Sequence, residues 1–167
     1  PEPEPVDGGL VWRFPETKRM STYITALIGG PYAKVEDSYS GQFGTIPLGI
    51  FCRKSMLQYL EAEDMFRDTK DGFEFFEKTF NTAYPFEKYD QVVVPQFNAG
   101  AMENAGCVTI LEDYVFRSRV TDYAYEARAN TVLHELAHMW FGDLVTMTWW
   151  DDLWLNESFA EWAAYYA

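Results

Sequence analysis

Short segments rich in β-branched and aromatic residues recur along the chain between turn residues, and such segments are typical of strands. They predict strands over residues 21–28 (STYITALI), 32–37, 47–53, 91–97 and 106–111. The segment 91–97 contains three consecutive valines, which indicates a strand buried on both faces. The Gly-Gly-Pro tripeptide over 29–31 is expected to turn the chain between the first two strands.

From Ser55 onward apolar residues return every three to four positions, and this period indicates helices. Helices are predicted from residue 55 to a break over 68–72, from 73 to Pro85, over 122–141 and over 151–167. Phe73, Phe76 and Phe80 line one face of the second helix, which predicts packing in the core. Gly142 is expected to end the third helix.

Composition narrows the possible partners. The chain has 167 residues and a formal net charge of −13, which disfavours nucleic acid and anionic lipid because both bind positive surfaces. The sequence contains no apolar run of the roughly 20 residues that a membrane helix needs, and no secretory leader is visible. We therefore expect no membrane segment in this chain and a cytoplasmic location, with Cys52 and Cys107 as free thiols.

The two ends of the sequence suggest an excised segment. The chain begins at Pro1 without a methionine and ends on the apolar run over residues 162–167. A domain rarely ends on such a run, so we expect the chain to be part of a longer protein whose remainder is missing.

The two histidines of the chain, His134 and His138, both lie in the segment His134-Glu135-Leu136-Ala137-His138. Four residues along a helix turn by about 400°, so both imidazoles project from one face and can share a zinc ion. Glu135 lies beside the first ligand, where its carboxylate can reach a water molecule on the metal. The alternative, a pair of polar surface residues, is disfavoured because the neighbouring residues are apolar.

A catalytic zinc ion needs a third protein ligand and an open fourth position. Glu157 is the candidate third ligand. The segment 142–150 allows the chain to reverse, which brings the last helix beside the helix that carries the two histidines. Glu161, one turn later, is either a partner of a ligand or a solvated acid. Asp151 and Asp152 either accept the second N–H of a ligand histidine or favour the N-terminal end of a helix.

These motifs together resemble those of a known family. The segments HELAH (134–138) and WLNESFAEW (154–162) resemble the gluzincin metallopeptidases, in which two histidines and a downstream glutamate hold zinc. The segment GAMEN (100–104) is similar to that of the aminopeptidase N-type zinc metallopeptidases, as are residues 15–32 and 84–106. Ser158 stands where the family commonly has glycine, and we expect little consequence because both residues are small.

The resemblance implies a zinc-dependent aminopeptidase that removes the N-terminal residue from peptides, with one Zn²⁺ per chain. It implies that Glu135 is the catalytic base and that Glu103 binds the substrate's terminal amine. The remaining GAMEN residues are implied to bind the substrate backbone: Gly100, Ala101, Met102 and Asn104. The implied partner is a peptide with a free N-terminus, and an extended peptide is expected to pair along an edge strand here.

The resemblance also implies the fold class, which is α+β. We expect a truncated thermolysin-like zincin catalytic domain, with a mixed sheet and the HExxH helix, preceded by the end of a β-sandwich domain. The Ser/Gly-rich connection over 38–45 is the expected boundary. Residues 1–44 are then the end of the N-terminal β-domain, and residues 45–167 are the first part of the catalytic domain.

The family also uses a tyrosine, which lies well beyond the third zinc ligand, to stabilise the oxyanion. Tyr165 and Tyr166 lie about 12–13 Å along the helix from Glu157, so they are poor substitutes. We therefore expect the 167-residue chain by itself to be weakly active or inactive.

Three other functions remain open. A zinc endopeptidase of the thermolysin type shares the metal ligands but has no need for Glu103 in GAMEN. The epoxide-hydrolase branch of the family uses the same zinc. A peptide-binding or zinc-binding module without turnover is the third alternative, for the chain taken alone.

Overall fold

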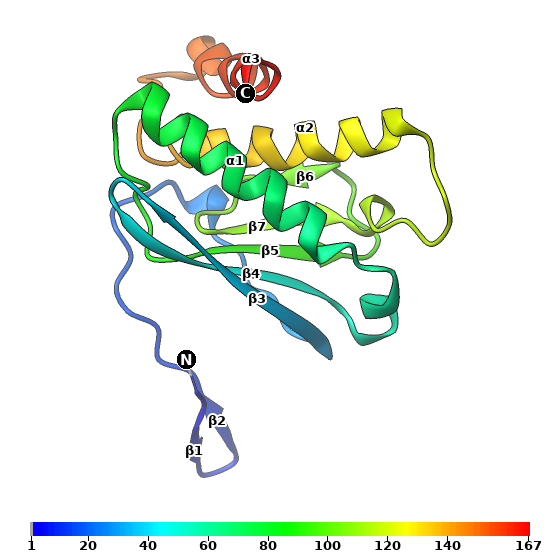
Figure 1. The fold of residues 1–167 in the computed structure, drawn as a ribbon. Coiled ribbons are helices and arrows are strands. Elements are labelled where there is room, and N and C mark those ends of the chain that lie inside the picture. Colours follow the sequence, from blue (N-terminus) through cyan, green and yellow to red (C-terminus); the bar gives the residue numbers. More distant parts are fainter. Residues whose placement is uncertain (1) are drawn as a thin grey trace.

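The computed structural model describes residues 2–167 as a mixed β-sheet covered on one face by helices (Figure 1). The strands are β1 (Glu4–Val6), β2 (Gly9–Val11), β3 (Tyr32–Gly41), β4 (Gly44–Arg53), β5 (Tyr89–Val94), β6 (Ala101–Met102) and β7 (Cys107–Leu111). The α-helices are α1 (Ala62–Phe80), α2 (Asp122–His138) and α3 (Glu157–Tyr166). Short 3-10 helices cover Thr22–Ile24, Lys54–Tyr59, Glu112–Tyr114 and Trp150–Leu155.

The sheet is ordered β3-β4-β5-β7-β6. Strands β3 and β4 form an antiparallel hairpin, β4, β5 and β7 run parallel, and β6 pairs antiparallel with β7. The short strand β6 is thus an edge strand, and it lies next to α2. Strands β1 and β2 form a separate hairpin that projects away from this sheet (Figure 1).

Helices α1 and α2 lie across one face of the sheet, and α3 stacks on α2 on the side away from the sheet (Figure 1). The predicted aromatic face of α1 is confirmed, because Phe73 and Phe76 are fully buried and pack against Trp140. Gly72 allows α1 and α2 to approach closely: a Cβ atom there would lie 2.5 Å from Cδ2 of Leu133. This close contact therefore determines how near α2 packs to α1.

Two predicted elements are wrong in the middle of the chain. The break over 68–72 does not occur, because α1 runs without interruption from Ala62 to Phe80. The connection over 38–45 is also wrong, since these residues pair as the ends of β3 and β4. Both strands belong to one sheet, so the predicted boundary between residues 44 and 45 is corrected. The assignment of earlier residues to a β-domain stays a prediction.

Two further predictions, for residues 21–28 and 151–167, are wrong, and both segments contribute residues to the candidate metal centre. Residues 21–28 are not a strand but a short 3-10 turn and an extended segment, held by tertiary contacts such as the hydrogen bond from the Ala105 N–H to the Ile24 carbonyl. The single helix predicted over 151–167 is divided into a 3-10 helix and α3, which meet at Asn156. Glu157 is therefore the first residue of α3, although the predicted helix would have begun six residues earlier.

The coarse fold class is confirmed: the structure is α+β, with a mixed sheet and the predicted helix that carries both histidines. That helix ends at His138, three residues earlier than predicted, and Gly142 follows with a φ of +129°. Over residues 2–167, none of the helices has the length and apolar character needed to cross a membrane.

Candidate metal centre

The last two turns of α2 place both histidines on one face, as the sequence predicts. The two Nε2 atoms of His134 and His138 lie 3.0 Å apart. His138 is fully buried and the side chain of His134 is 19% exposed, so the pair lies at the edge of the core with one open side. Two imidazole nitrogens this close favour a shared cation.

Glu157 completes the cluster from the start of α3. Its Oε2 atom lies 3.8 Å from Nε2 of His134 and 3.7 Å from Nε2 of His138. A point about 2 Å from all three atoms therefore exists, which fits zinc bonds of about 2.0–2.2 Å. The three predicted ligands thus converge without rearrangement. Glu157 is half exposed, which leaves access from solvent.

Each ligand histidine has an acceptor for its other ring nitrogen. Nδ1 of His134 lies 2.9 Å from Oε2 of Glu161, and Nδ1 of His138 lies 2.9 Å from Oδ1 of Asn156 and 3.0 Å from the Phe141 carbonyl. These acceptors favour a proton on Nδ1, which leaves both Nε2 lone pairs for a metal. Two roles were open for Glu161, a solvated acid or a hydrogen-bond partner of a ligand histidine. The structure supports the second role, with His134 as the partner.

Asp151 and Asp152 do not accept a hydrogen bond from a ligand histidine. Both are exposed, and the acceptors described within residues 2–167 are Glu161, Asn156 and the Phe141 carbonyl. The two aspartates lie in the first turn of the 3-10 helix over Trp150–Leu155, which agrees with the alternative that they favour a helix N-terminus.

The Glu135 carboxylate lies beside the ligands and is 5% exposed. Its Oε2 atom is buried and has no hydrogen-bond partner among the residues that the structure describes. Burial, with smaller contributions from Glu103 and Glu157, raises the pKa of Glu135 to about 8 although His134 opposes the shift. A buried carboxyl group with a free oxygen and a raised pKa is suited to accept and return a proton near neutral pH.

The GAMEN segment lies at the edge strand of the sheet. Ala101 and Met102 form β6, and the Gly100 carbonyl accepts a hydrogen bond from the Leu111 N–H at 2.9 Å. The Asn104 side chain accepts a hydrogen bond from Oγ1 of Thr109 at 2.9 Å, which holds the turn after β6. The predicted substrate-binding roles of these residues stay predictions.

Glu103 follows β6 and is 6% exposed. One atom each of Glu103, Glu135 and His138 lie within 4.8 Å of one another, so the GAMEN carboxylate reaches the metal centre. The hydroxyl of Tyr23 donates to Oε1 of Glu103 at 3.1 Å, and burial together with this carboxylate raises the pKa of Tyr23. The geometry therefore brings together the three predicted metal ligands, His134, His138 and Glu157. The predicted base Glu135 and the predicted amine-binding residue Glu103 lie beside them.

Three residues of this region were not predicted from the sequence: Tyr23, Asn156 and Asp143. Asp143 is 4% exposed, and burial followed by the charges of Glu103 and Glu135 raises its pKa to about 8. The site is thus a cluster of buried acids, which favours a cationic ligand. The sequence signal for Asn156 was its place directly before Glu157, but Tyr23 lies far from the motifs and carries no local signal.

Comparison with known proteins places these motifs in context. The Peptidase family M1 domain matches residues 65–167. The chain is 61% identical over 163 residues to an aminopeptidase N of Streptomyces lividans, a match that covers 98% of this chain and 19% of that protein.

Two more distant relatives carry the same kind of name. Aminopeptidase Ey of Gallus gallus is 43% identical over 161 residues, covering 93% of this chain and 16% of the relative. A probable aminopeptidase 1 of Saccharolobus solfataricus is 41% identical over 163 residues, covering 97% of this chain and 20% of the relative. The chain thus spans one fifth or less of the length of these curated relatives.

Proposed function

The chain belongs to peptidase family M1, and from this membership we propose that it carries the metal centre and the amine-binding carboxylate of a zinc-dependent aminopeptidase. The single observation that carries the proposal is the convergence of three ligand atoms from His134, His138 and Glu157 on one point. The relatives that bear the name aminopeptidase support the reaction class. The predicted partner is a peptide with a free N-terminus.

The metal fits the residues present. His134, His138 and Glu157 would hold one Zn²⁺ per chain, and a carboxylate oxygen of Glu135 lies within 4.8 Å of one ring nitrogen of His138. Bound zinc supplies Lewis acidity toward a carbonyl oxygen and lowers the pKa of water. Glu135 accepts the proton of the attacking water molecule and transfers it to the leaving amine. The orientation of both imidazoles is maintained by Glu161 and Asn156.

Recognition of a free N-terminus requires a negative group near the metal, because the terminal amine is a cation at neutral pH. Glu103 supplies this group in the proposal. Its buried position strengthens the attraction, since a charge pair removed from water interacts more strongly than an exposed pair. The edge strand β6 would align the substrate backbone through Gly100, Ala101, Met102 and Asn104.

The finer fold assignment is also a proposal. We assign the sheet, α2 and α3 to a thermolysin-like zincin domain, because an edge strand beside the metal-binding helix is suited to hold an extended substrate. The β-sandwich that the resemblance implies before this domain, and the cytoplasmic location, stay predictions.

The proposal can be tested in a chimera. The chain replaces the matching segment of the Streptomyces lividans aminopeptidase N, whose 61% identity makes the exchange conservative. The zinc-loaded chimera should hydrolyse leucine p-nitroanilide, and the isosteric Glu135→Gln variant should keep its zinc but lose most of the activity. N-acetylleucine p-nitroanilide should be a poor substrate.

Two of the alternatives, the endopeptidase and the binding module, each predict a different result in this assay. Equal or faster hydrolysis of the acetylated substrate would contradict the aminopeptidase and favour an endopeptidase. Zinc binding without hydrolysis of either substrate would favour a binding module. Near-normal activity in Glu135→Gln would refute the role of the base.

A further inference from the structure

We propose that Tyr23 and Asn156 are positioning residues that orient the Glu103 carboxylate toward a substrate's terminal ammonium and fix its place relative to the metal ligands. This inference rests on the proposed function, in which Glu103 binds the amine. It adds two residues from segments outside the HExxH and GAMEN motifs.

Both residues contact the same oxygen of Glu103. The Tyr23 hydroxyl donates to Oε1 at 3.1 Å, and Nδ2 of Asn156 lies 3.4 Å from that oxygen. Oε2 of Glu103 accepts none of the hydrogen bonds described for residues 2–167. Two donors on one oxygen hold the carboxylate in one orientation, and the second oxygen is left for a cationic ligand.

Asn156 links this carboxylate to the metal ligands. Its Oδ1 atom accepts from Nδ1 of His138 at 2.9 Å, and its Nδ2 atom lies 3.2 Å from Oε1 of Glu157. The side chain is 4% exposed, so these contacts are shielded from competing water. A single buried amide thus contacts two of the three ligands and the amine-binding residue.

The turn after α2 is shaped around this amide. Gly142 has a φ of +129°, and a Cβ atom there would overlap Oδ1 of Asn156 and approach Nδ1 of His138. Only glycine satisfies both the backbone conformation and the space that the amide requires. The contact between Asn156 and His138 therefore requires glycine at position 142.

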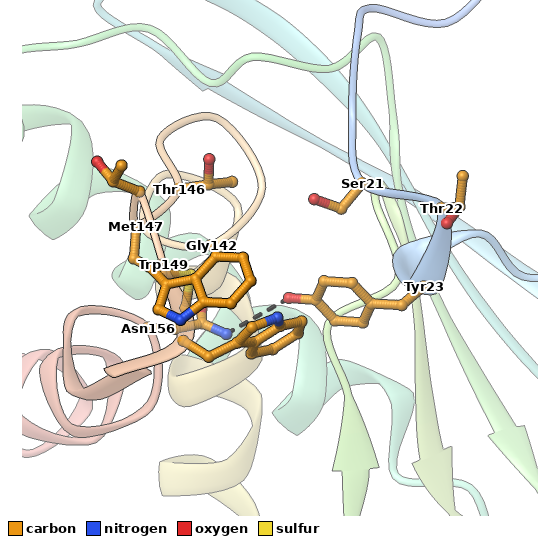
Figure 2. Close-up of a pocket in the computed structure, with 10 residues that line it drawn as sticks. Ser21, Thr22, Tyr23, Gly142, Thr146, Met147, Trp149 and Asn156 are labelled. Atoms are coloured by element: carbon orange, nitrogen blue, oxygen red, sulfur yellow. Dashed lines mark hydrogen bonds between the residues drawn. The ribbon is translucent and has the colours of Figure 1, made fainter. Parts of the chain in front are cut away.

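Tyr23 contacts the Asn156 amide from across the cavity (Figure 2). Figure 2 shows its hydroxyl pointing across the cavity to Asn156, whose Nδ2 atom lies 3.4 Å away. The ring lines a cavity of about 490 Å³ together with Trp149 and Trp150. Because the Ala105 N–H donates to the Ile24 carbonyl, the segment of Tyr23 is also tied to the end of the GAMEN turn.

These contacts have a direct consequence for substrate register. The metal ligands determine where a scissile carbonyl is bound, and Glu103 determines where the terminal amine is bound. If the two groups keep a fixed separation, the terminal amine and the scissile carbonyl of a substrate are held in one register. A Glu103 carboxylate that rotated freely would bind the amine in several positions. Affinity for the amine would then be lower, because the side chain would lose its rotational freedom on binding.

The test measures ligand binding separately from turnover. The probes are leucinamide, which has a free amine, and N-acetylleucinamide, which does not, and binding to the zinc-loaded protein is measured by calorimetry. Tyr23→Phe removes one hydroxyl and keeps the ring. It should weaken leucinamide binding about tenfold, as expected for a hydrogen bond to a charged group. N-acetylleucinamide binding should change less than about twofold.

Two controls separate positioning from a general structural effect. Tyr123→Phe makes the same chemical change at an exposed tyrosine of α2 and should leave both affinities unchanged. In a Glu103→Gln background, Tyr23→Phe should have little further effect, because its influence acts through that carboxylate. Asn156→Leu should weaken leucinamide binding and also zinc affinity, since the amide contacts His138.

The inference is overturned if Tyr23→Phe leaves leucinamide binding unchanged, weakens both probes equally, or acts fully in the Glu103→Gln background. Equal binding of the two probes by the unmodified protein would also overturn it. Absence of hydrolysis in the chimera, with the selectivity for leucinamide intact and lost in Tyr23→Phe, would refute the proposed reaction and leave this inference standing.

Discussion

At the scale of single residues, the buried acids around the metal centre have different hydrogen-bond environments. Glu103 accepts hydrogen bonds on one oxygen, whereas Glu135 has a buried oxygen that has no partner among residues 2–167. A carboxylate held by donors is suited to bind a cation in a fixed place, and a carboxylate with an unpartnered oxygen is suited to exchange a proton. The two residues thus take separate roles from similar side chains.

The first residue-scale prediction concerns Glu103. Glu103→Gln keeps the shape of the side chain and removes its charge. It should reduce kcat/KM of the chimera for leucine p-nitroanilide by about 30-fold or more, because loss of one partner of a desolvated charge pair costs about 2–5 kcal/mol. Binding of N-acetylleucinamide should change little. Equal losses for free and acetylated ligands would make Glu103 a structural residue.

The second residue-scale prediction concerns Glu161, whose Oε2 atom accepts a hydrogen bond from Nδ1 of His134. Glu161→Gln removes the charge that orients the imidazole, and zinc affinity should fall about 10- to 100-fold, the usual cost of losing such a partner. Competition with a chromophoric chelator measures this affinity. Asp151→Asn is the matched control, because Asp151 is exposed in the neighbouring 3-10 helix. A similar loss in both variants would point to a general charge effect.

At the scale of secondary-structure elements, the packing of α1 against α2 places the metal-binding helix. Gly72→Ala would put a methyl group 2.5 Å from Leu133 and 3.0 Å from Leu136. Although alanine favours helices by about 1 kcal/mol, overpacking of a buried contact costs about 1–3 kcal/mol, and we expect net destabilisation. Urea denaturation measures the change.

Gly29→Ala is the control, because a Cβ atom at Gly29 has nothing within 4 Å. It should change the free energy of unfolding by less than about 0.5 kcal/mol. A more stable Gly72→Ala protein would show that α2 can move away from α1 and would contradict a fixed spacing between the two helices.

The sequence predicted that His134, His138 and Glu157 come together, because they lie on two short helical segments joined by a chain reversal. Their role as metal ligands stays a prediction. It failed where tertiary contacts decide the structure. Residues 21–28 have the composition of a strand, yet the buried Ile24 and the Tyr23–Glu103 hydrogen bond hold them in another conformation. Gly72 was interpreted as part of a break, because sequence alone does not show that a neighbouring helix needs the space.

The same reason explains the missed site residues. Asn156 interrupts the predicted last helix, and its side chain contacts His138 and Glu103, which are distant in the sequence. No periodicity or local motif indicates such contacts. Of the two alternatives for Asp151 and Asp152, only the hydrogen bond to a histidine fails, because the 3-10 helix that carries them leaves both side chains exposed.

At the scale of the whole molecule, the chain corresponds to one fifth or less of the length of its relatives. The family resemblance implies an oxyanion-stabilising tyrosine beyond the third ligand, and loss of one oxyanion donor costs about 100- to 1,000-fold in rate. We therefore predict that the 167-residue chain hydrolyses leucine p-nitroanilide at least 100-fold more slowly than the chimera. Rates within tenfold of each other would contradict this account of the oxyanion.

The central claim is that His134, His138 and Glu157 form one zinc site, and zinc titration of the purified chain tests it most directly. We predict one zinc ion per chain. Alanine at any of the three positions should weaken binding more than the roughly 10- to 100-fold cost of losing an outer hydrogen-bond partner, while Asp152→Asn should bind as the unmodified protein does. Undiminished zinc binding in any of the three alanine variants, or no stoichiometric binding by the unmodified chain, would contradict the claim.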